Sequence, residues 1–300
     1  MSLMDTQLQN NIFKTALLFE GGSMRAAYTC AVVAFFLEKS VFFDNVYGVS
    51  AGTSNLVNYL SRDADRAIRS FTDFFDFPNV GDMKTFVQGK GLFNAHYIYQ
   101  EAGKPDGVLP FDFDTFSRNP AKGTLVAFER DTGLDRYFRK SDIKTLDELM
   151  VRVRASSTLP IMMPPPCIDG LYYYDGGFAK GGGLPIELIK NDGFEKVVVI
   201  RTRPRGFRRE PGYQWARYLL NNRPFLRDAL LARDKNYNAA CYQLEQMERD
   251  GDAYIFYCDN MELTGMERDF NSLGRAFEAG YAQIQRDWPK MLDFIERSEA

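Results

Sequence analysis

The chain begins with short apolar runs that alternate with longer helical patterns. Thr15–Glu20 is apolar and ends at a Gly-Gly-Ser turn, which predicts a buried strand. Arg25–Lys39 has helical length and a mostly apolar surface, so it predicts a helix buried against a sheet. A strand over Val46–Ser50 and a helix over residues 51–63 repeat the order. Strand, turn and helix repeated in this way are typical of right-handed parallel βαβ units.

Similar patterns predict further elements along the rest of the chain. The predicted strands are Gly123–Gly133, which ends in a turn, the start of Gly170–Pro185, Glu195–Pro204 and Ala253–Cys258. The predicted helices are Ala64–Phe77, Asn94–Ala102, Thr145–Pro160, Tyr213–Asn222, Pro224–Arg249 and Asn271–Ile295. Thr145 is a plausible N-cap with Glu148 three residues on. The order predicts an α/β fold over residues 12–203 and a mostly helical extension over residues 204–300. Because residues 253–258 are expected to join the same sheet, we expect both parts to pack as one domain.

Composition narrows the classes of function. A net charge of −3 argues against a dedicated nucleic-acid binder. The four cysteines are far apart in sequence, which favours free thiols in a reducing compartment. The first residues show no basic region followed by an apolar run, so we expect no signal peptide. The longest apolar stretch, residues 26–37, is too short to span a bilayer. We therefore expect a cytoplasmic protein whose contact with the inner membrane surface, if any, is peripheral.

A serine motif follows the second predicted strand. The sequence GVSAG over residues 48–52 matches the G-x-S-x-G pattern of a serine nucleophile on a sharp turn between a strand and a helix. In such a turn Ser50 lies at the apex, and Gly48 and Gly52 relieve the clash where strand and helix cross. The new helix points free N–H groups toward an oxyanion beside the serine. The alternative is an ordinary tight turn, which the flanking strand and helix make less favoured.

The glycine turn after the first strand is a second candidate element. Gly21, Gly22 and Ser23 precede a helix, where backbone N–H groups are presented to an anion. Neither dinucleotide-binding spacing nor a P-loop lysine is present, so an oxyanion hole for acyl transfer fits better than phosphate binding. Arg25 either braces this loop and adds positive potential or is an exposed arginine at a helix start.

An aspartate ends one of the predicted apolar strands. Asp175 is followed by Gly176 and Gly177, and we expect its carboxylate at the edge where parallel strands end and ligands bind. A turn-forming Asp-Gly pair is the common alternative, and we expect such a turn at Asp169 and Gly170. The second glycine and the preceding strand favour Asp175 as the functional carboxylate.

The chain has one histidine, His96. An α/β-hydrolase triad needs its histidine after the acid in chain order, and no histidine follows Asp175. His96 lies in a helical, aromatic segment, where a packing or surface role is the more common one. A dyad of Ser50 and Asp175 remains, in which burial has to raise the pKa of the aspartate for it to act as a base.

The glycine loop with its arginine, the G-x-S-x-G motif and the D-G-G motif occur in this order between Lys14 and Pro204. This order resembles the patatin-like phospholipases, especially the bacterial patatin-like acyl hydrolases. The resemblance implies a three-layer α/β/α fold with a mainly parallel central sheet, residues 12–203 being the catalytic part. It also implies a Ser-Asp dyad that hydrolyses lipid acyl esters with no metal or other cofactor, Ser50 as nucleophile and Asp175 as base. The oxyanion loop corresponds to Gly21, Gly22, Ser23 and Arg25.

Two positions depart from the family pattern. The family usually has a third glycine where this chain has Ser23, and a glycine after the arginine where it has Ala26. A left-handed backbone at Ser23 would cost about 1–2 kcal/mol. These departures leave a catalytically silent lipid-binding protein as one alternative, and an acyltransferase is another.

Features of the substrate are less defined in the sequence. The expected partner is a lipid or another acyl ester, and no nucleic acid is expected. Residues 201–210 hold five arginines, which suit anionic headgroups or, as the more common arrangement, a solvated loop paired with acidic residues. The segments LPIMMPPP and LYYYD suit an acyl pocket or core packing.

Overall fold

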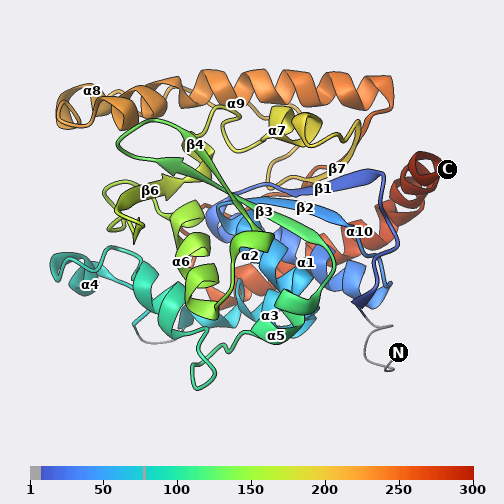
Figure 1. The fold of residues 1–300 in the computed structure, drawn as a ribbon, viewed down its shortest axis with the longest axis horizontal. Helices are drawn as coiled ribbons and strands as arrows, with labels where there is room; N and C mark the ends of the chain where they lie inside the picture. The colour runs from blue at the N-terminus through green and yellow to red at the C-terminus, as the bar shows by residue number, and fades with distance from the viewer. Residues whose placement is uncertain (1–7, 77–78) are drawn as a thin grey trace.

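One sheet of eight strands forms the centre of the protein in the computed structural model, which describes residues 8–76 and 79–300 (Figure 1). The strands are β1 Thr15–Phe19, β2 Asn45–Val49, β3 Lys122–Glu129, β4 Asp135–Arg139, β5 Cys167–Ile168, β6 Leu171–Asp175, β7 Lys196–Ile200 and β8 Ala253–Phe256. Their order is β5-β6-β3-β2-β1-β7-β8, with β4 paired to β3 off this path. The pairs β3–β2, β2–β1, β1–β7 and β7–β8 are parallel, and β4, β5 and β6 pair antiparallel.

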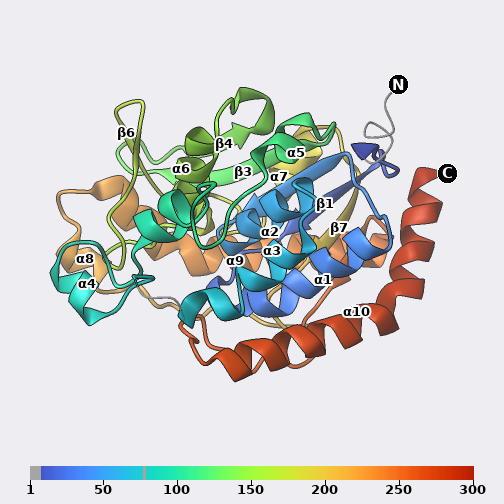
Figure 2. The ribbon, with the colours of Figure 1, turned by 90° about the horizontal axis from the view of Figure 1, so that it is seen from below.

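Helices cover both faces of the sheet, which confirms the predicted three-layer α/β/α fold with a mainly parallel sheet and a helical C-terminal portion (Figures 1 and 2). The helices are α1 Ala26–Glu38, α2 Ala51–Leu60, α3 Ala64–Arg69, α4 Met83–Val87, α5 Phe113–Arg118, α6 Leu146–Ser157, α7 Ile186–Asn191, α8 Ala216–Leu219, α9 Pro224–Asp250 and α10 Phe270–Glu299. One apolar core lies between the sheet and the layer of α1, α2, α6 and α10, and a second lies between the sheet and α7 with α9. The central strands read as continuous apolar runs because both of their faces are buried.

Several predicted boundaries are wrong, and a local side chain explains one of them. The predicted helix over residues 64–77 ends at Arg69, where the Thr72 hydroxyl bonds back to the Ile68 carbonyl, and a short 3₁₀ turn follows at Asp73–Asp76. Its last predicted residue, Phe77, lies outside the described residues, as do residues 1–7, where no signal peptide is expected. The helix predicted over residues 94–102 is a π-helical turn over His96–Glu101. Only the four residues of α8 are helical in the segment 213–222.

Strand β4 was missing from the sequence prediction. It pairs antiparallel with β3, and its pattern of exposed and half-buried residues resembles a solvated loop. The predicted turn at Asp169 and Gly170 is present as the two-residue connection of the β5–β6 hairpin, with a positive φ at both positions. Thr145 caps α6 as predicted, its hydroxyl accepting the N–H of Glu148.

The C-terminal segment contributes to both layers of helices and to the sheet. Strand β8 joins the same sheet, as the sequence predicts, and pairs with β7 with Ala253 opposite Val197. Helix α10 packs along α1, and α9 packs against the opposite face of the sheet. We therefore propose that residues 204–300 belong to the same domain as residues 12–203.

Candidate active site

The serine motif forms a strained turn between β2 and α2. Ser50 caps α2 with φ 56° and ψ −129°, a backbone conformation that a residue with a side chain rarely adopts. Strand β2 and helix α2 meet so closely that a Cβ on Gly48 would lie 2.8 Å from the Gly52 carbonyl oxygen. Helix α2 also lies against the neighbouring strand β1, because a Cβ on Gly52 would lie 2.1 Å from the Phe19 carbonyl oxygen. The Ser50 N–H donates to Ser156 Oγ at 2.9 Å, which holds the turn from below.

The sheet register brings Asp175 beside Ser50. Val49 on β2 is opposite Val126 on β3, and the next residue of β3, Ala127, is opposite Asp175 on β6. Ser50 and Asp175 therefore lie at the same height on either side of β3. The carboxylate lies at the predicted edge of the sheet. The expected reason was that Asp175 ends a parallel strand, whereas β6 runs antiparallel to β3 and reaches this edge because it overlaps only the last residues of β3.

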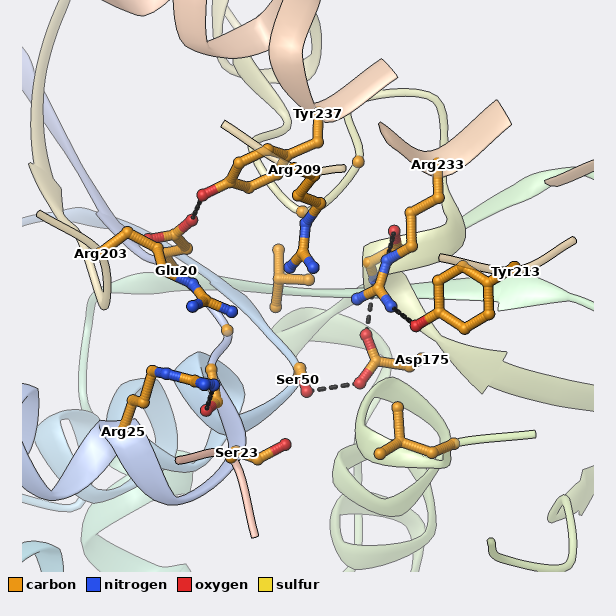
Figure 3. A pocket seen from close by; sticks show the side chains of 18 of the residues that line it. Glu20, Ser23, Arg25, Ser50, Asp175, Arg203, Arg209, Tyr213, Arg233 and Tyr237 are labelled. Carbon is orange, nitrogen blue, oxygen red and sulfur yellow. Dashed lines mark hydrogen bonds between the residues drawn. The ribbon is translucent and has the colours of Figure 1, made fainter. Parts of the chain in front are cut away.

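A hydrogen bond joins the two side chains. Ser50 Oγ donates to Asp175 Oδ2, while the Gly177 N–H donates to Oδ1 at 2.6 Å (Figure 3). Asp175 is only 2% exposed. Burial raises the pKa of Asp175 above its ordinary value, and the Arg233 charge and these two hydrogen bonds oppose part of that rise. The geometry suits a buried carboxylate that accepts a proton from the serine.

The glycine loop between β1 and α1 lies next to this pair. A Cβ on Gly21 would lie 2.7 Å from Ser50 Cβ, and one on Gly22 would lie 2.4 Å from Thr202 Oγ1, so neither position has room for a side chain. Within the part of the chain that the structure describes, the N–H groups of Gly22 and Ser23 have no hydrogen-bond acceptor. Arg25 is half-buried and its Nη1 donates to the Gly22 carbonyl at 3.4 Å, so it braces the loop and is not an exposed helix-start residue.

Ser23 adopts a left-handed backbone conformation, which is strained for serine but not for the glycine that the family usually has at this position. Its φ is 51°, and its hydroxyl makes no hydrogen bond within residues 8–76 and 79–300. We expect Ser23→Gly to raise the free energy of unfolding by about 0.5–1 kcal/mol, because roughly 1–2 kcal/mol of strain is relieved while the added chain entropy of glycine offsets part of it. Urea denaturation measures the change.

Ser117 provides the matched control for Ser23→Gly. It lies in α5 with a helical backbone, so Ser117→Gly should lower the free energy of unfolding. If the free energy of unfolding falls equally in Ser23→Gly and Ser117→Gly, the backbone at Ser23 is not strained.

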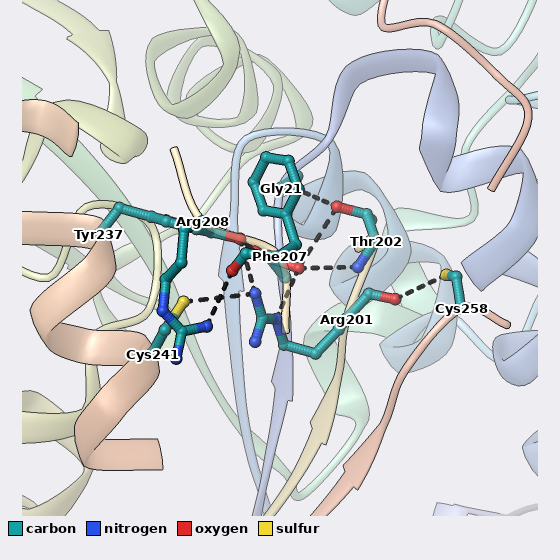
Figure 4. A network of polar contacts seen from close by, with 9 residues as sticks. Gly21, Arg201, Thr202, Phe207, Arg208, Tyr237, Cys241 and Cys258 are labelled. Carbon is teal, nitrogen blue, oxygen red and sulfur yellow. Dashed lines mark hydrogen bonds and ion pairs between the residues drawn. The ribbon is translucent and has the colours of Figure 1, made fainter. Parts of the chain in front are cut away.

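A buried ion pair supports the glycine loop from behind (Figure 4). Glu20 and Arg201 are 3% and 1% exposed, and Arg201 Nε lies 3.1 Å from Glu20 Oε2. Glu20 Oε2 also accepts the Thr202 N–H at 2.7 Å, and Glu20 Oε1 accepts the Tyr237 hydroxyl at 2.6 Å. Burial opposes ionisation, but Arg201 and these donors hold the pKa of Glu20 below its ordinary value. Thr202 Oγ1 then donates to the Gly21 carbonyl at 2.6 Å, so β1, β7 and α9 jointly fix the loop.

Ser50 opens onto a polar cavity of about 250 Å³. Four arginines line it, and Figure 3 shows their guanidinium groups directed toward the space above Ser50 and Asp175. The four arginines are Arg25, Arg203, Arg209 and Arg233. The cavity has room for about eight water molecules at ~30 Å³ each, or for a small polar group.

The five arginines of residues 201–210 divide into two sets. Three are paired with carboxylates: Arg201 with Glu20, Arg205 with Glu248 and Arg208 with Glu245. The pairs of Arg205 and Arg208 are partly exposed, as the solvated-loop interpretation expects, whereas the pair of Arg201 is buried. The other two, Arg203 and Arg209, line the cavity. Part of the loop is therefore paired with acidic residues, and Arg203 and Arg209 are placed at the cavity, where binding of an anionic group stays a prediction.

A smaller apolar pocket of about 50 Å³ lies on the other side of Ser50. Its lining includes Phe71, Phe93, Leu159 and Met163. Leu159 and Met163 belong to the predicted LPIMMPPP segment, whereas Tyr173 and Tyr174 of LYYYD are buried in the cores. Ser50 thus lies at the junction of a polar and an apolar space.

The histidine lines neither of these spaces. His96 is 56% exposed, its Nε2 lies 3.1 Å from Glu101 Oε1, and it lines neither the polar cavity nor the apolar pocket. Among the described residues, no group of three or more His, Cys, Asp or Glu side chains is placed to hold a metal ion. No helix in residues 8–76 and 79–300 is long and apolar enough to cross a membrane.

Sequence reasoning missed the cavity residues that come from outside the three motifs. Arg233 and Tyr237 lie on α9, more than fifty residues after Asp175, and Tyr213 precedes α8. Arg233 Nη1 donates to the Tyr213 hydroxyl and its Nε donates to the Gly177 carbonyl at 3.1 Å. Amphipathic periodicity predicts α9 itself but does not show which of its polar residues face the sheet edge.

Comparison with known proteins identifies two segments. A family model described as patatin-like phospholipase matches residues 17–188, and one described as a domain of unknown function (DUF6363) matches residues 223–296. No curated protein sequence matches the chain. Among solved structures, VipD from Legionella pneumophila is similar over 95% of this chain and 67% of its own, with 11% sequence identity and a TM-score of 0.48.

Proposed function

The chain belongs to the patatin-like phospholipase family, and from that premise we propose that it hydrolyses acyl esters of lipids through an acyl-enzyme formed on Ser50. The observation that carries the proposal is the hydrogen bond from Ser50 Oγ to the buried carboxylate of Asp175. A serine on a strained turn with a carboxylate as its hydrogen-bond partner has the arrangement of an activated nucleophile.

In the proposed reaction, Ser50 Oγ attacks the ester carbonyl carbon while its proton passes to Asp175. The tetrahedral intermediate collapses as the carbon–oxygen bond to the alcohol breaks, and the alcohol leaves with the proton from Asp175. Water then attacks the acyl-enzyme, gives one proton to Asp175 and releases the fatty acid, after which the proton returns to Ser50.

The oxyanion is proposed to bind backbone N–H groups. Those of Gly22 and Ser23, in the loop beside Ser50, have no acceptor among the described residues, and that of Ala51 lies at the start of α2. Each well-placed donor is worth about 3–4 kcal/mol of transition-state stabilisation. The apolar pocket beside Ser50 is the proposed site for the start of the acyl chain, with the alcohol portion in the polar cavity.

Covalent labelling tests the proposal directly. A fluorophosphonate should add to Ser50 in the folded protein, detected by intact mass and peptide mapping, and the adduct should be missing from Ser50→Ala. Folded protein that takes no adduct would favour the catalytically silent lipid-binding alternative. Product analysis with an added alcohol then separates hydrolysis from acyl transfer.

The proposal also predicts the pH dependence. Asp175 has to be ionised to accept the proton, and burial raises its pKa, so kcat/KM for a p-nitrophenyl ester should fall as the pH falls through that raised value. The midpoint should lie above about 3.9, the ordinary pKa of an aspartic acid. Because the Arg233 charge favours the carboxylate, Arg233→Gln should move the acid limb to higher pH.

The matched control for this profile is His96→Ala, which should leave the acid limb in place because the imidazole is exposed and lines neither space. A limb near the ordinary histidine pKa, about 6.5, that disappears in His96→Ala would assign the base to the histidine instead.

A further inference from the structure

The four cavity arginines have no carboxylate partner within residues 8–76 and 79–300. Among the described residues, no Asp or Glu oxygen lies within ion-pair distance of Arg25, Arg203, Arg209 or Arg233. Arg209 Nε is buried and has no hydrogen-bond partner in this part of the chain. The neighbouring Arg205 and Arg208, which face away from the cavity lining, are each paired with a glutamate. Within residues 201–210, the arginines without a carboxylate partner are therefore the two that line the cavity, Arg203 and Arg209.

Placing these charges together is unfavourable in the empty cavity. Burial, followed by the charges of Arg25 and Arg209, lowers the pKa of Arg203 to about 10. Burial also lowers the pKa of Arg209, and the charge of Arg233 is the next largest cause of that lowering. Mutual repulsion of this kind does not stabilise a fold, and the chain as a whole carries a net charge of −3. A bound anion removes the repulsion.

Two carboxylates also line the cavity, but both are already engaged. Glu20 is paired with Arg201 behind the loop, and Asp175 accepts hydrogen bonds from Ser50 and Gly177. The four arginines thus outnumber the two lining carboxylates, and Arg201 offsets one of these. The space above Ser50 is strongly positive.

From this arrangement we propose that Arg203, Arg209 and Arg233, with Arg25, form an anion subsite that selects acyl esters whose alcohol portion carries a phosphate monoester. The inference rests on the proposed function, because it places the phosphate on the alcohol side of the ester that Ser50 attacks. Guanidinium groups bind phosphate oxygens through paired N–H donors, and four of them match a doubly charged group better than a zwitterionic headgroup. A headgroup with a quaternary ammonium would bring a cation into the same positive space.

The subsite also gives a role to the C-terminal segment. Arg233 is on α9, within residues 223–296, the part of the chain matched as a domain of unknown function. Its guanidinium is held by Tyr213 and the Gly177 carbonyl, beside the carboxylate of the proposed dyad. The segment therefore contributes a fixed charge to substrate recognition, in addition to helices on both faces of the sheet and strand β8.

Substrate discrimination tests the inference. We compare kcat/KM for three short-chain esters with the same acyl group: a monoacylglycerol phosphate, the monoacylglycerol and the monoacyl glycerophosphocholine. The wild type should prefer the phosphate monoester by roughly tenfold or more, and Arg203→Gln/Arg209→Gln should bring the ratios close to one. The matched control, Arg205→Gln/Arg208→Gln, removes two arginines from the same loop and should keep the wild-type ratios. Ratios that do not differ between the two double variants would overturn the inference.

A binding measurement separates this inference from the proposed function. Ser50→Ala should bind glycerol 3-phosphate in calorimetry, and the Arg203→Gln/Arg209→Gln variant of that protein should bind it at least about tenfold more weakly. If Ser50 forms no acyl-enzyme but glycerol 3-phosphate binds in this way, the proposed function fails and the anion subsite stands. If esters are hydrolysed but glycerol 3-phosphate does not bind, the anion subsite fails alone. An acylated sugar phosphate compared with the monoacylglycerol phosphate shows whether the phosphate comes from a water-soluble ester or a lipid.

Discussion

Ser50→Ala is expected to lower kcat/KM for p-nitrophenyl butyrate by about 10⁴-fold or more while the protein stays folded. The loss is large because the variant removes the atom that forms the acyl-enzyme, and the backbone N–H groups alone supply only part of the rate enhancement. The fold should survive because Ser50 contributes its strained backbone, and not a core side chain, to the β2–α2 turn. Initial rates measured alongside circular dichroism check both parts.

His96→Ala is the control for Ser50→Ala. Its imidazole is exposed and paired with Glu101, so this variant should keep most of the activity. Asp175→Asn should resemble Ser50→Ala, since an amide cannot accept the serine proton. Wild-type rates in Ser50→Ala, or a loss in His96→Ala as large as in Asp175→Asn, would contradict the dyad.

The sequence was most informative where one short segment determines one local structure. The G-x-S-x-G motif between a strand and a helix defines the turn at Ser50, because a glycine at position 48 lets β2 meet α2 and one at position 52 lets α2 approach β1. The same holds for the loop at Gly21 and Gly22 and for the parallel order of β1, β2 and β7. In these cases the local backbone geometry requires particular residue types, so the residue pattern predicts the geometry.

The sequence was less informative where contacts join distant segments. Glu20 and Arg201 are 181 residues apart, and neither residue type predicts burial. Residues 201–210 hold five arginines of the same type, and only the tertiary structure separates Arg203 and Arg209 from those paired with glutamates. Asp175 was predicted at the right edge, but the antiparallel direction of β6 depends on the β5–β6 hairpin turn and on pairing with β3. Strand β4 was missed because its residues are half-exposed and polar.

The buried pair of Glu20 and Arg201 carries the largest expected effect on stability. Glu20→Gln keeps the shape of the side chain but leaves the Arg201 guanidinium, 1% exposed, without its counter-charge. We expect the free energy of unfolding at pH 7 to fall by about 3–5 kcal/mol. Because the pKa of Glu20 is lowered in the folded protein, its ionised form stabilises the fold above the unfolded-state pKa, and this contribution is lost as the pH falls through the folded value. The difference between wild type and variant should therefore shrink below about pH 4.3.

An exposed ion pair, that of Asp259 and Arg286, is the control for the buried pair of Glu20 and Arg201. Asp259→Asn breaks the contact with Arg286, in which the two side chains are 48% and 60% exposed, and should cost about 1 kcal/mol or less. In Glu20→Gln/Arg201→Met both charges are removed, so much of the lost stability should return. If Glu20→Gln costs no more than Asp259→Asn, the loop at Gly21 and Gly22 does not depend on this pair. If instead the single variant is unstable and the double variant recovers, the charge beneath the loop, and not the shape of the side chain, is what holds the N–H groups of Gly22 and Ser23 beside Ser50.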